Sequence, residues 1–210
     1  MLTLFEELYL MAIDDEKGVL VSSAKGRLGC GLAGAVLAQL ALMDKIKVNE
    51  NHRLEITDNE PTGDELLDEF LSEVKESKPR KVSYWVSALN EHPKLMSKQI
   101  SERLVAKGIL NQEDDHLFWP SQSSNHQADV PLKYGIKRRL RGTILANEDI
   151  DLHNLTLLSI IRACNLLKLV YTKDERKAAQ RRIHEKFIGE ALDNPIAQTI
   201  EEIERAVSDL

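Results

Sequence analysis

The chain has 210 residues, of which 42% are hydrophobic and 30% charged, the balance of a globular protein with a substantial core. We therefore expect a single domain over residues 1–210. The formal net charge of −6 argues against nucleic acid as a partner, and no apolar run reaches the roughly 18–20 residues that cross a bilayer. Two isolated cysteines, Cys30 and Cys164, lie in apolar helical segments and indicate a reduced cytoplasmic protein without a disulfide framework.

The first quarter of the chain predicts two helices and a hairpin. Thr3 and Glu6 have the spacing of a capping box, and apolar residues follow at helical spacing. A second helix is predicted over GLAGAVLAQLAL, residues 31–42, whose small residues permit close packing. The segment KIKVNENHRLEIT, residues 45–57, alternates around a turn at residues 49–51 and predicts a short β-hairpin.

An acidic helix is predicted over residues 64–77. Thr62 and Glu65 have the spacing of a second capping box, and Pro79 stops the helix. Eight acidic residues and one lysine fall between residues 58 and 76. The carboxylates lie on the polar side of this amphipathic stretch, which favours a solvated face over a catalytic cleft.

The middle of the chain predicts two more helices, a hairpin and a loop. Helices are expected around residues 82–89 and over residues 93–108, the second begun by a proline and ended by a glycine. A hairpin is expected over residues 109–121, with its turn at residues 113–115. The polar segment SQSSNHQAD, residues 121–129, is expected to be a mobile loop.

From Pro131 the pattern is helical to the end of the chain. The segment LTLLSIIRACNLLKLVY, residues 155–171, is apolar on nearly every face and is predicted to be the central core helix. The predicted fold class is therefore mainly α, a single compact helical domain around a central hydrophobic helix, with short β-hairpins.

No motif in the sequence predicts catalysis. There is no Walker-type phosphate loop and no glycine-rich dinucleotide turn after a strand. The six histidines are scattered, and no cysteine pair has the spacing of a zinc site. We therefore expect no enzymatic activity, no cofactor and no metal, and an unrecognised enzyme is the weakest of the classes considered.

Two segments instead predict contact with phosphate or with a membrane. Residues 131–141, PLKYGIKRRLR, contain five basic residues and no acid, and guanidinium groups match the geometry of phosphate oxygens. The nearby stretch HLFWP places aromatic side chains beside these cations, as an interfacial membrane contact requires. The alternatives are an ordinary solvated helix face and aromatic residues packed on the core. The candidates are Lys137, Arg138, Arg139 and Arg141 for phosphate, and Leu117, Phe118 and Trp119 for the membrane.

Several stretches, in order, resemble the Golgi phosphoprotein three family. The most distinctive is PTGDELLDEFLSEVKESKP, residues 61–79, which a tryptophan-containing helix follows. LTLFEELYLMAIDDEKG looks like the family's opening helix and GLAGAVLAQLAL like its second, and ERLVAKGIL and IKRRLR follow in the expected order. The resemblance spans Leu2 to about Val207.

This resemblance implies a mostly helical domain with a basic flat face and a β-hairpin that serves membrane contact or self-association. It also implies a non-enzymatic, cytoplasmic, peripheral membrane protein. Eukaryotic members of the family bind phosphatidylinositol 4-phosphate on Golgi membranes and act as adaptors for the tails of glycosyltransferases.

The lipid-binding positions of the family are only partly kept. The family's tryptophan and arginine fall on Ala24 and Ala33, and its later basic pair falls on Lys94 and Ser97. Only Lys94 keeps a charge, so we expect weak or absent recognition of the phosphoinositide headgroup and a generic attraction to anionic bilayers. These departures, with the short N-terminus, suggest a bacterial-type member. The candidate headgroup contacts here are Lys94, Lys98, Lys25 and Arg27.

Two hypotheses follow. In the first, the protein is a peripheral adaptor whose partner is an anionic phospholipid surface. In the second, it is a soluble interaction scaffold or homo-oligomer, in which the basic surface meets the acidic helix 64–77 of a partner or of another copy.

Overall fold

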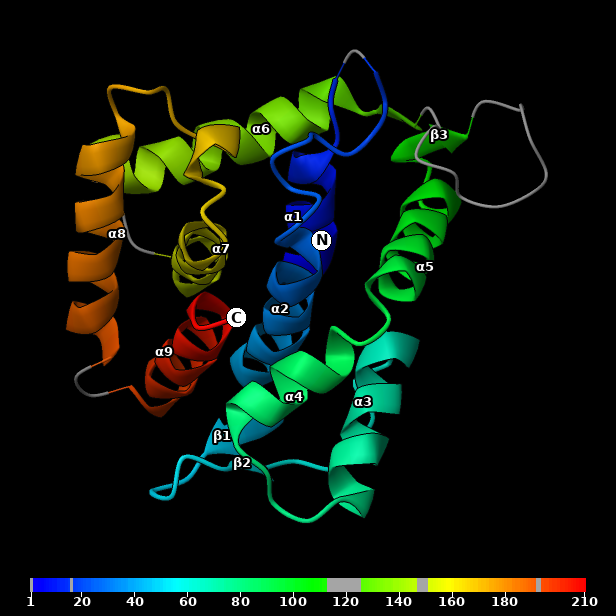
Figure 1. Ribbon diagram of the computed structural model, residues 1–210, viewed down its shortest axis with the longest axis vertical. Coiled ribbons are helices and arrows are strands. Elements are labelled where there is room, and N and C mark those ends of the chain that lie inside the picture. Colours follow the sequence, from blue (N-terminus) through cyan, green and yellow to red (C-terminus); the bar gives the residue numbers. More distant parts are fainter. Residues whose placement is uncertain (1, 16, 113–125, 147–150, 192–193) are drawn as a thin grey trace.

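The computed structural model describes residues 2–15, 17–112, 126–146, 151–191 and 194–210 (Figure 1). In this part of the chain the fold is mainly α with two short antiparallel hairpins, so the predicted fold class is confirmed. The helices are α1 Leu4–Ala12, α2 Leu28–Leu42, α3 Glu65–Glu76, α4 Val82–Leu89, α5 Pro93–Ala106, α6 Val130–Arg141, α7 Leu152–Ala163, α8 Arg176–Ala191 and α9 Pro195–Ser208, with a π-helical turn at Gly142–Ala146 and a 3₁₀ turn, η2, at Leu167–Leu169. The strands are β1 Ile46–Val48, β2 Leu54–Ile56, β3 Leu110–Gln112 and β4 His126–Ala128.

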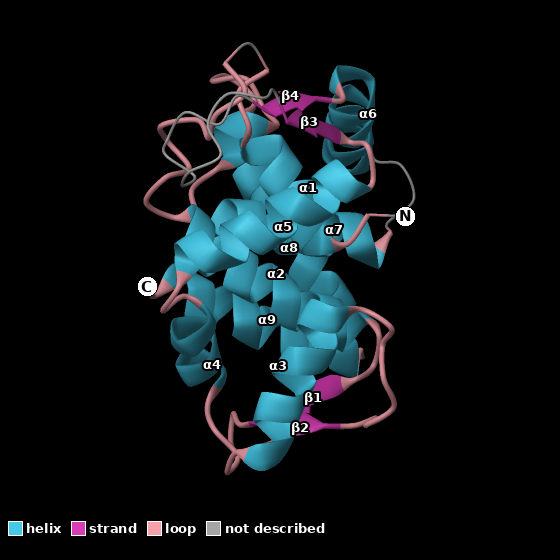
Figure 2. Ribbon diagram, turned by 90° about the vertical axis from the view of Figure 1, so that its right-hand side faces the viewer, coloured by secondary structure: helices cyan, strands magenta, loops and turns pink. Residues whose placement is uncertain are grey.

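Helix α2 forms the centre of the molecule, and α1, α4, α5, α7 and α9 pack against it (Figures 1 and 2). Apart from Gln39, its side chains are apolar or small, and nearly all of them are buried, as the central position of the helix requires. Among the described helices, none is long and apolar enough to cross a membrane.

The predicted central helix over residues 155–171 is wrong in length and in position. Helix α7 is buried, but it ends at Ala163, and Asn165 takes a left-handed conformation with φ of 57°. Asparagine tolerates this conformation and commonly ends helices there. The apolar residues that follow form the short turn η2, and α2 occupies the central position instead.

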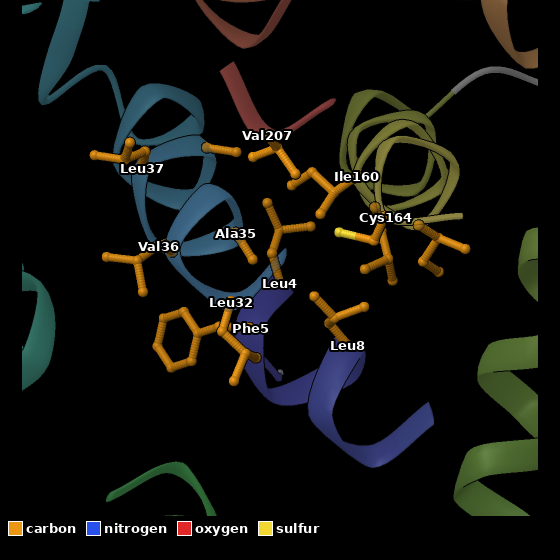
Figure 3. Close-up of a cluster of buried hydrophobic side chains, with 14 of the residues drawn as sticks. Leu4, Phe5, Leu8, Leu32, Ala35, Val36, Leu37, Ile160, Cys164 and Val207 are labelled. Carbon is orange, nitrogen blue, oxygen red and sulfur yellow. The ribbon is translucent and has the colours of Figure 1, made fainter. Parts of the chain in front are cut away.

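Two glycines on α2 allow α7 and α9 to approach it closely. A Cβ atom added to Gly31 would lie 2.7 Å from Cys164 Sγ, and one added to Gly34 would lie 2.5 Å from Val207 Cγ2. Figure 3 shows Cys164 and Val207 among the apolar side chains around α2. The small residues noted in the sequence therefore serve the packing of α7 and α9 on α2.

Of the two predicted capping boxes, the first is confirmed and the second is wrong. The Thr3 side chain accepts a hydrogen bond from the Glu6 N–H, and the Glu6 side chain accepts one from the Thr3 N–H. Two backbone N–H groups at the start of α1 are thereby satisfied. Helix α3 is instead capped by Asp64, whose carboxylate accepts the N–H groups of the first turn. Thr62 turns its hydroxyl to Asp68, at 2.7 Å. Asp64 is the better acceptor because its charge also engages Arg103 of α5.

The first hairpin is confirmed and the second differs from its prediction. Strands β1 and β2 pair around the predicted turn, with Ile46 opposite Ile56. Strand β3 pairs with β4, which lies inside the segment 121–129 that was expected to be a mobile loop. The partner of β3 is therefore β4, and not the segment directly after residues 113–115 as predicted. The predicted turn at residues 113–115 lies outside the described residues. The two hairpins lie at opposite ends of the long axis (Figures 1 and 2).

Candidate functional site

The start of α2 and the corner between α4 and α5 lie against each other. A Cβ atom on Gly29 would lie 2.8 Å from Pro93 Cβ and 2.2 Å from Asn90 Oδ1, so only glycine permits this approach. Asn90 also donates a hydrogen bond to Cys30 Sγ at 3.2 Å. The loop before α2 and the first turn of α5 are thereby fixed beside one another, although they are more than 60 residues apart in sequence.

Four of the predicted cations sit on these two segments, and we call this set the corner cluster: Lys25, Arg27, Lys94 and Lys98. All four side chains are exposed. Lys98 lies 3.6 Å from Glu102 on its own helix, and both partners are more than half exposed, so the pair constrains Lys98 little. Leu95, beside Lys94, is 54% exposed.

The backbone at this corner adds positive potential to the cluster. Arg27 and His92 are the N-cap residues of α2 and α5, and neither side chain bonds to its helix. The start of a helix carries a partial positive charge and free N–H donors, which favour anions. The cations and the two helix starts therefore give this corner a positive electrostatic potential.

The positions that the resemblance aligned with the family's tryptophan and arginine contribute nothing to this surface. Ala24 and Ala33 are both fully buried, and Ser97 is half-buried. A side chain that stacks on a headgroup is therefore missing from both alanine positions.

The basic stretch of α6 divides into engaged and free side chains. Arg139 donates a hydrogen bond of 2.6 Å to Glu7, a carboxylate that is only 3% exposed. Arg141 donates two hydrogen bonds, of 2.7 and 2.6 Å, to Glu175. These two arginines hold α6 to α1 and to the chain before α8. Arg138 is exposed, and no ion pair joins it to any residue in the described ranges.

The Arg141–Glu175 pair predicts a measurable pH dependence of stability. Hydrogen bonds from Arg141 and from the Thr172 N–H lower the pKa of Glu175 to about 2. Because this folded pKa lies below the unfolded value of about 4.3, the pair stabilises the fold above that value and stops doing so as the pH falls toward 2. We expect the melting temperature of Glu175→Gln to lie below that of the parent at pH 7, and the gap to narrow between pH 5 and 2. Glu185→Gln on the exposed side of α8 is the control, and a gap that persists unchanged at low pH would contradict the prediction.

The acidic helix and the basic helix lie at opposite ends of the molecule. In Figures 1 and 2, α3 lies at one end of the long axis with β1 and β2, and α6 lies at the other end with β3. The side chains of Glu65, Glu69 and Glu73 are exposed on α3, which agrees with the predicted solvated face. The charge segregation seen in the sequence therefore persists in the folded protein.

The predicted membrane hairpin is not covered by the structure, and two lysines outside the predicted site residues lie beside one of them. Leu117, Phe118 and Trp119 lie outside the described residues. Sequence reasoning missed Lys133 and Lys168, which lie with Lys137 around one hollow. Lys168 was hidden inside the supposed core helix 155–171, and only the helix-ending signal of Asn165 points to its exposure.

Comparison with known proteins confirms the family to which the sequence was expected to belong. The sequence profile of the family described as "Golgi phosphoprotein 3 (GPP34)" matches residues 4–203. A vacuolar protein sorting-associated protein 74 from Eremothecium gossypii is 29% identical over 164 residues, which are 69% of this chain and 49% of that protein. One from Schizosaccharomyces pombe is 27% identical over 173 residues, which are 73% of this chain and 51% of that protein. The chain thus spans about half the length of these relatives.

Proposed function

Because the chain belongs to the Golgi phosphoprotein 3 (GPP34) family, we propose that it is a non-enzymatic peripheral membrane adaptor that docks on anionic phospholipid. The observation that carries the proposal is the corner cluster, in which cations from two segments surround two uncapped helix starts. Eukaryotic membranes that present such lipids include the Golgi. Two relatives are named vacuolar protein sorting-associated proteins, and a role in protein sorting fits an adaptor.

Charge and exposure support a lipid surface as the partner. Each basic residue close to an anionic bilayer contributes about 1 kcal/mol to binding. Lys25, Arg27 and Lys94 are exposed and, within the ranges that the structure describes, free of ion pairs. Leu95 gives the cluster an apolar neighbour for the headgroup region.

The corner cluster predicts how binding to vesicles responds to mutation. The triple variant Lys25→Gln/Arg27→Gln/Lys94→Gln is expected to bind phosphatidylglycerol vesicles about 100-fold more weakly at low salt, since three contributions of about 1 kcal/mol are lost. Co-sedimentation over a lipid titration measures the change. The control is Lys47→Gln/Lys75→Gln/Lys177→Gln, which removes the same charge from exposed lysines elsewhere and should bind nearly as the parent does.

Varying the lipid composition of the vesicles tests whether the protein prefers one anionic headgroup over another. With Ala24 and Ala33 at the family's positions, we expect vesicles of equal surface charge to bind within about threefold, whether the anion is phosphatidylglycerol or phosphatidylinositol 4-phosphate. A strong preference for the phosphoinositide would show that other residues recognise its headgroup. Binding that ignores anionic lipid altogether, or that the triple variant retains, would refute the membrane proposal.

The alternative function is a soluble scaffold or oligomer, and the separation of α3 from α6 favours considering it. Acidic and basic ends on one molecule can pair head to tail between copies. Light scattering coupled to size exclusion distinguishes the two functions. A stable oligomer that dissociates in high salt and does not bind vesicles would support the scaffold.

A further inference from the structure

A hollow of about 280 Å³ lies where the end of α1 and the loop after it meet α6 and η2. Its floor is apolar and is formed by Met11, Ile13, Val21 and Leu169. Met11 and Ile13 are each only 1% exposed, so the accessible part of the floor comes from the half-buried Val21 and Leu169. Typical sites for drug-sized ligands measure roughly 300–1,000 Å³, so this hollow suits a smaller group such as a lipid headgroup.

Charged side chains line the hollow, and their partners differ. Lys133 is held in place by the Asp15 carboxylate, at 2.6 Å, and by the carbonyl of Ile13. Asp14 accepts the backbone N–H of Lys17 at 2.9 Å. Lys137 and Lys168 have no ion pair with any residue that the structure describes. The Asp15 charge is paired with Lys133, and the remaining two ammonium groups outnumber the Asp14 carboxylate, so the lining keeps a net positive charge that favours an incoming anion.

The mouth of the hollow has an aromatic and aliphatic edge on α6. Val130 and Tyr134 are 49% and 68% exposed, and they stand one helical turn apart on the same face. Lys137 continues that face by one further turn. Tyrosine beside lysine is the combination enriched at membrane interfaces, where the ring meets the acyl boundary and the cation meets the headgroups.

We propose that this hollow is a second lipid contact, in which Lys137 and Lys168 bind the phosphate of one phospholipid while its glycerol rests on the apolar floor and Tyr134 enters the interface. The proposal deepens the proposed function and rests on it. The corner cluster uses none of these residues, although the loop between α1 and α2 contributes to both contacts, so the two contacts are separable by mutation.

The test compares matched variants on phosphatidylglycerol vesicles. Lys137→Gln/Lys168→Gln is expected to bind about 30-fold more weakly than the parent, from the loss of two charges near the surface. Lys75→Gln/Lys177→Gln removes the same charge elsewhere and is expected to bind as the parent does. All four lysines lie at the surface, and thermal melts confirm that each variant is folded. Equal binding by the two double variants would overturn the inference.

A second readout follows the aromatic edge. Tyr134→Trp is expected to be quenched by vesicles that carry brominated acyl chains, beyond any quenching seen for the parent with its own tryptophans. Glycerol 3-phosphate, at the same phosphate concentration as the lipid, is expected not to displace the protein from vesicles. Displacement by this soluble compound would assign the hollow to a free anion, and unchanged quenching would remove Tyr134 from the interface.

The outcomes separate this inference from the function on which it rests. If the corner variant loses binding and the Lys137→Gln/Lys168→Gln variant keeps it, the membrane function stands and the second contact is refuted. If the parent itself does not bind anionic vesicles, both fail together.

Discussion

Replacing Glu6 by glutamine is expected to lower the free energy of unfolding by about 3 kcal/mol, which corresponds to roughly 6–12 °C in melting temperature for a chain of this size. The Glu6 side chain is fully buried. One of its oxygens accepts a hydrogen bond of 2.6 Å from Lys107 and lies 3.6 Å from Arg103, and the other accepts the Thr3 N–H. Removing one partner from a buried ion pair costs about 3–5 kcal/mol because the remaining charges lose their compensation.

Glutamine keeps the shape of the side chain, so the loss measures charge and hydrogen bonding and leaves no cavity. Its amide group would also turn a donor toward either the Thr3 N–H or Lys107, which are donors themselves. We place the effect at the lower end of the range because Lys107 is 40% exposed and can return to water. Urea unfolding at pH 7 measures the change.

The matched control is Glu102→Gln, which makes the same substitution in the same kind of pair at the surface. Glu102 lies 3.6 Å from Lys98, with both side chains more than half exposed. Pairs of this kind contribute about 0–1 kcal/mol, so the control should change stability by no more than that. Equal effects at the two positions would mean that burial of Glu6 does not govern the strength of its ion pairs.

Local patterns in the sequence predicted most of the fold. The capping box of α1, the proline and glycine that bound α5, and the hairpin of β1 and β2 are all formed by neighbours in sequence. The errors arise where a residue distant in sequence determines the local structure. Asp64 replaced Thr62 as the cap of α3 because Arg103 lies within reach, and no pattern within residues 60–80 contains that arginine.

The candidate site was less predictable than the fold, for the same physical reason. Lys137, Arg138, Arg139 and Arg141 are alike in sequence, but the carboxylates that engage two of them come from α1 and from the chain before α8. A run of basic residues shows which charges exist and not which of them are neutralised. Likewise, the contact that joins the start of α2 to α5 depends on a missing side chain at Gly29, which carries no charge pattern at all.

The second large effect is expected at Gly31, where α1, α2 and α7 meet. A Cβ atom there would lie 2.7 Å from Cys164 Sγ and 3.2 Å from Leu8 Cδ2, as the crowding of these labelled side chains in Figure 3 suggests. We expect Gly31→Leu to lower the free energy of unfolding by about 3 kcal/mol, at the upper end of what overpacking usually costs. Gly135→Leu is the control, because a Cβ atom at Gly135 in α6 would meet nothing within 4 Å.

A smaller substitution at Gly31 can test whether the Cys164 sulfur is the atom that an added side chain would clash with. Alanine is a better helix former than glycine by about 1 kcal/mol, so Gly31→Ala would stabilise α2 if there were room for its methyl group. We expect it to destabilise instead, and Cys164→Ala, which removes the sulfur, to relieve part of that cost. In a double-mutant cycle followed by urea unfolding, the coupling between the two positions should reach about 1 kcal/mol, as contacting residues show. Strict additivity would mean that the Cys164 sulfur moves aside at little cost and that Leu8 is the contact that limits the approach of the helices.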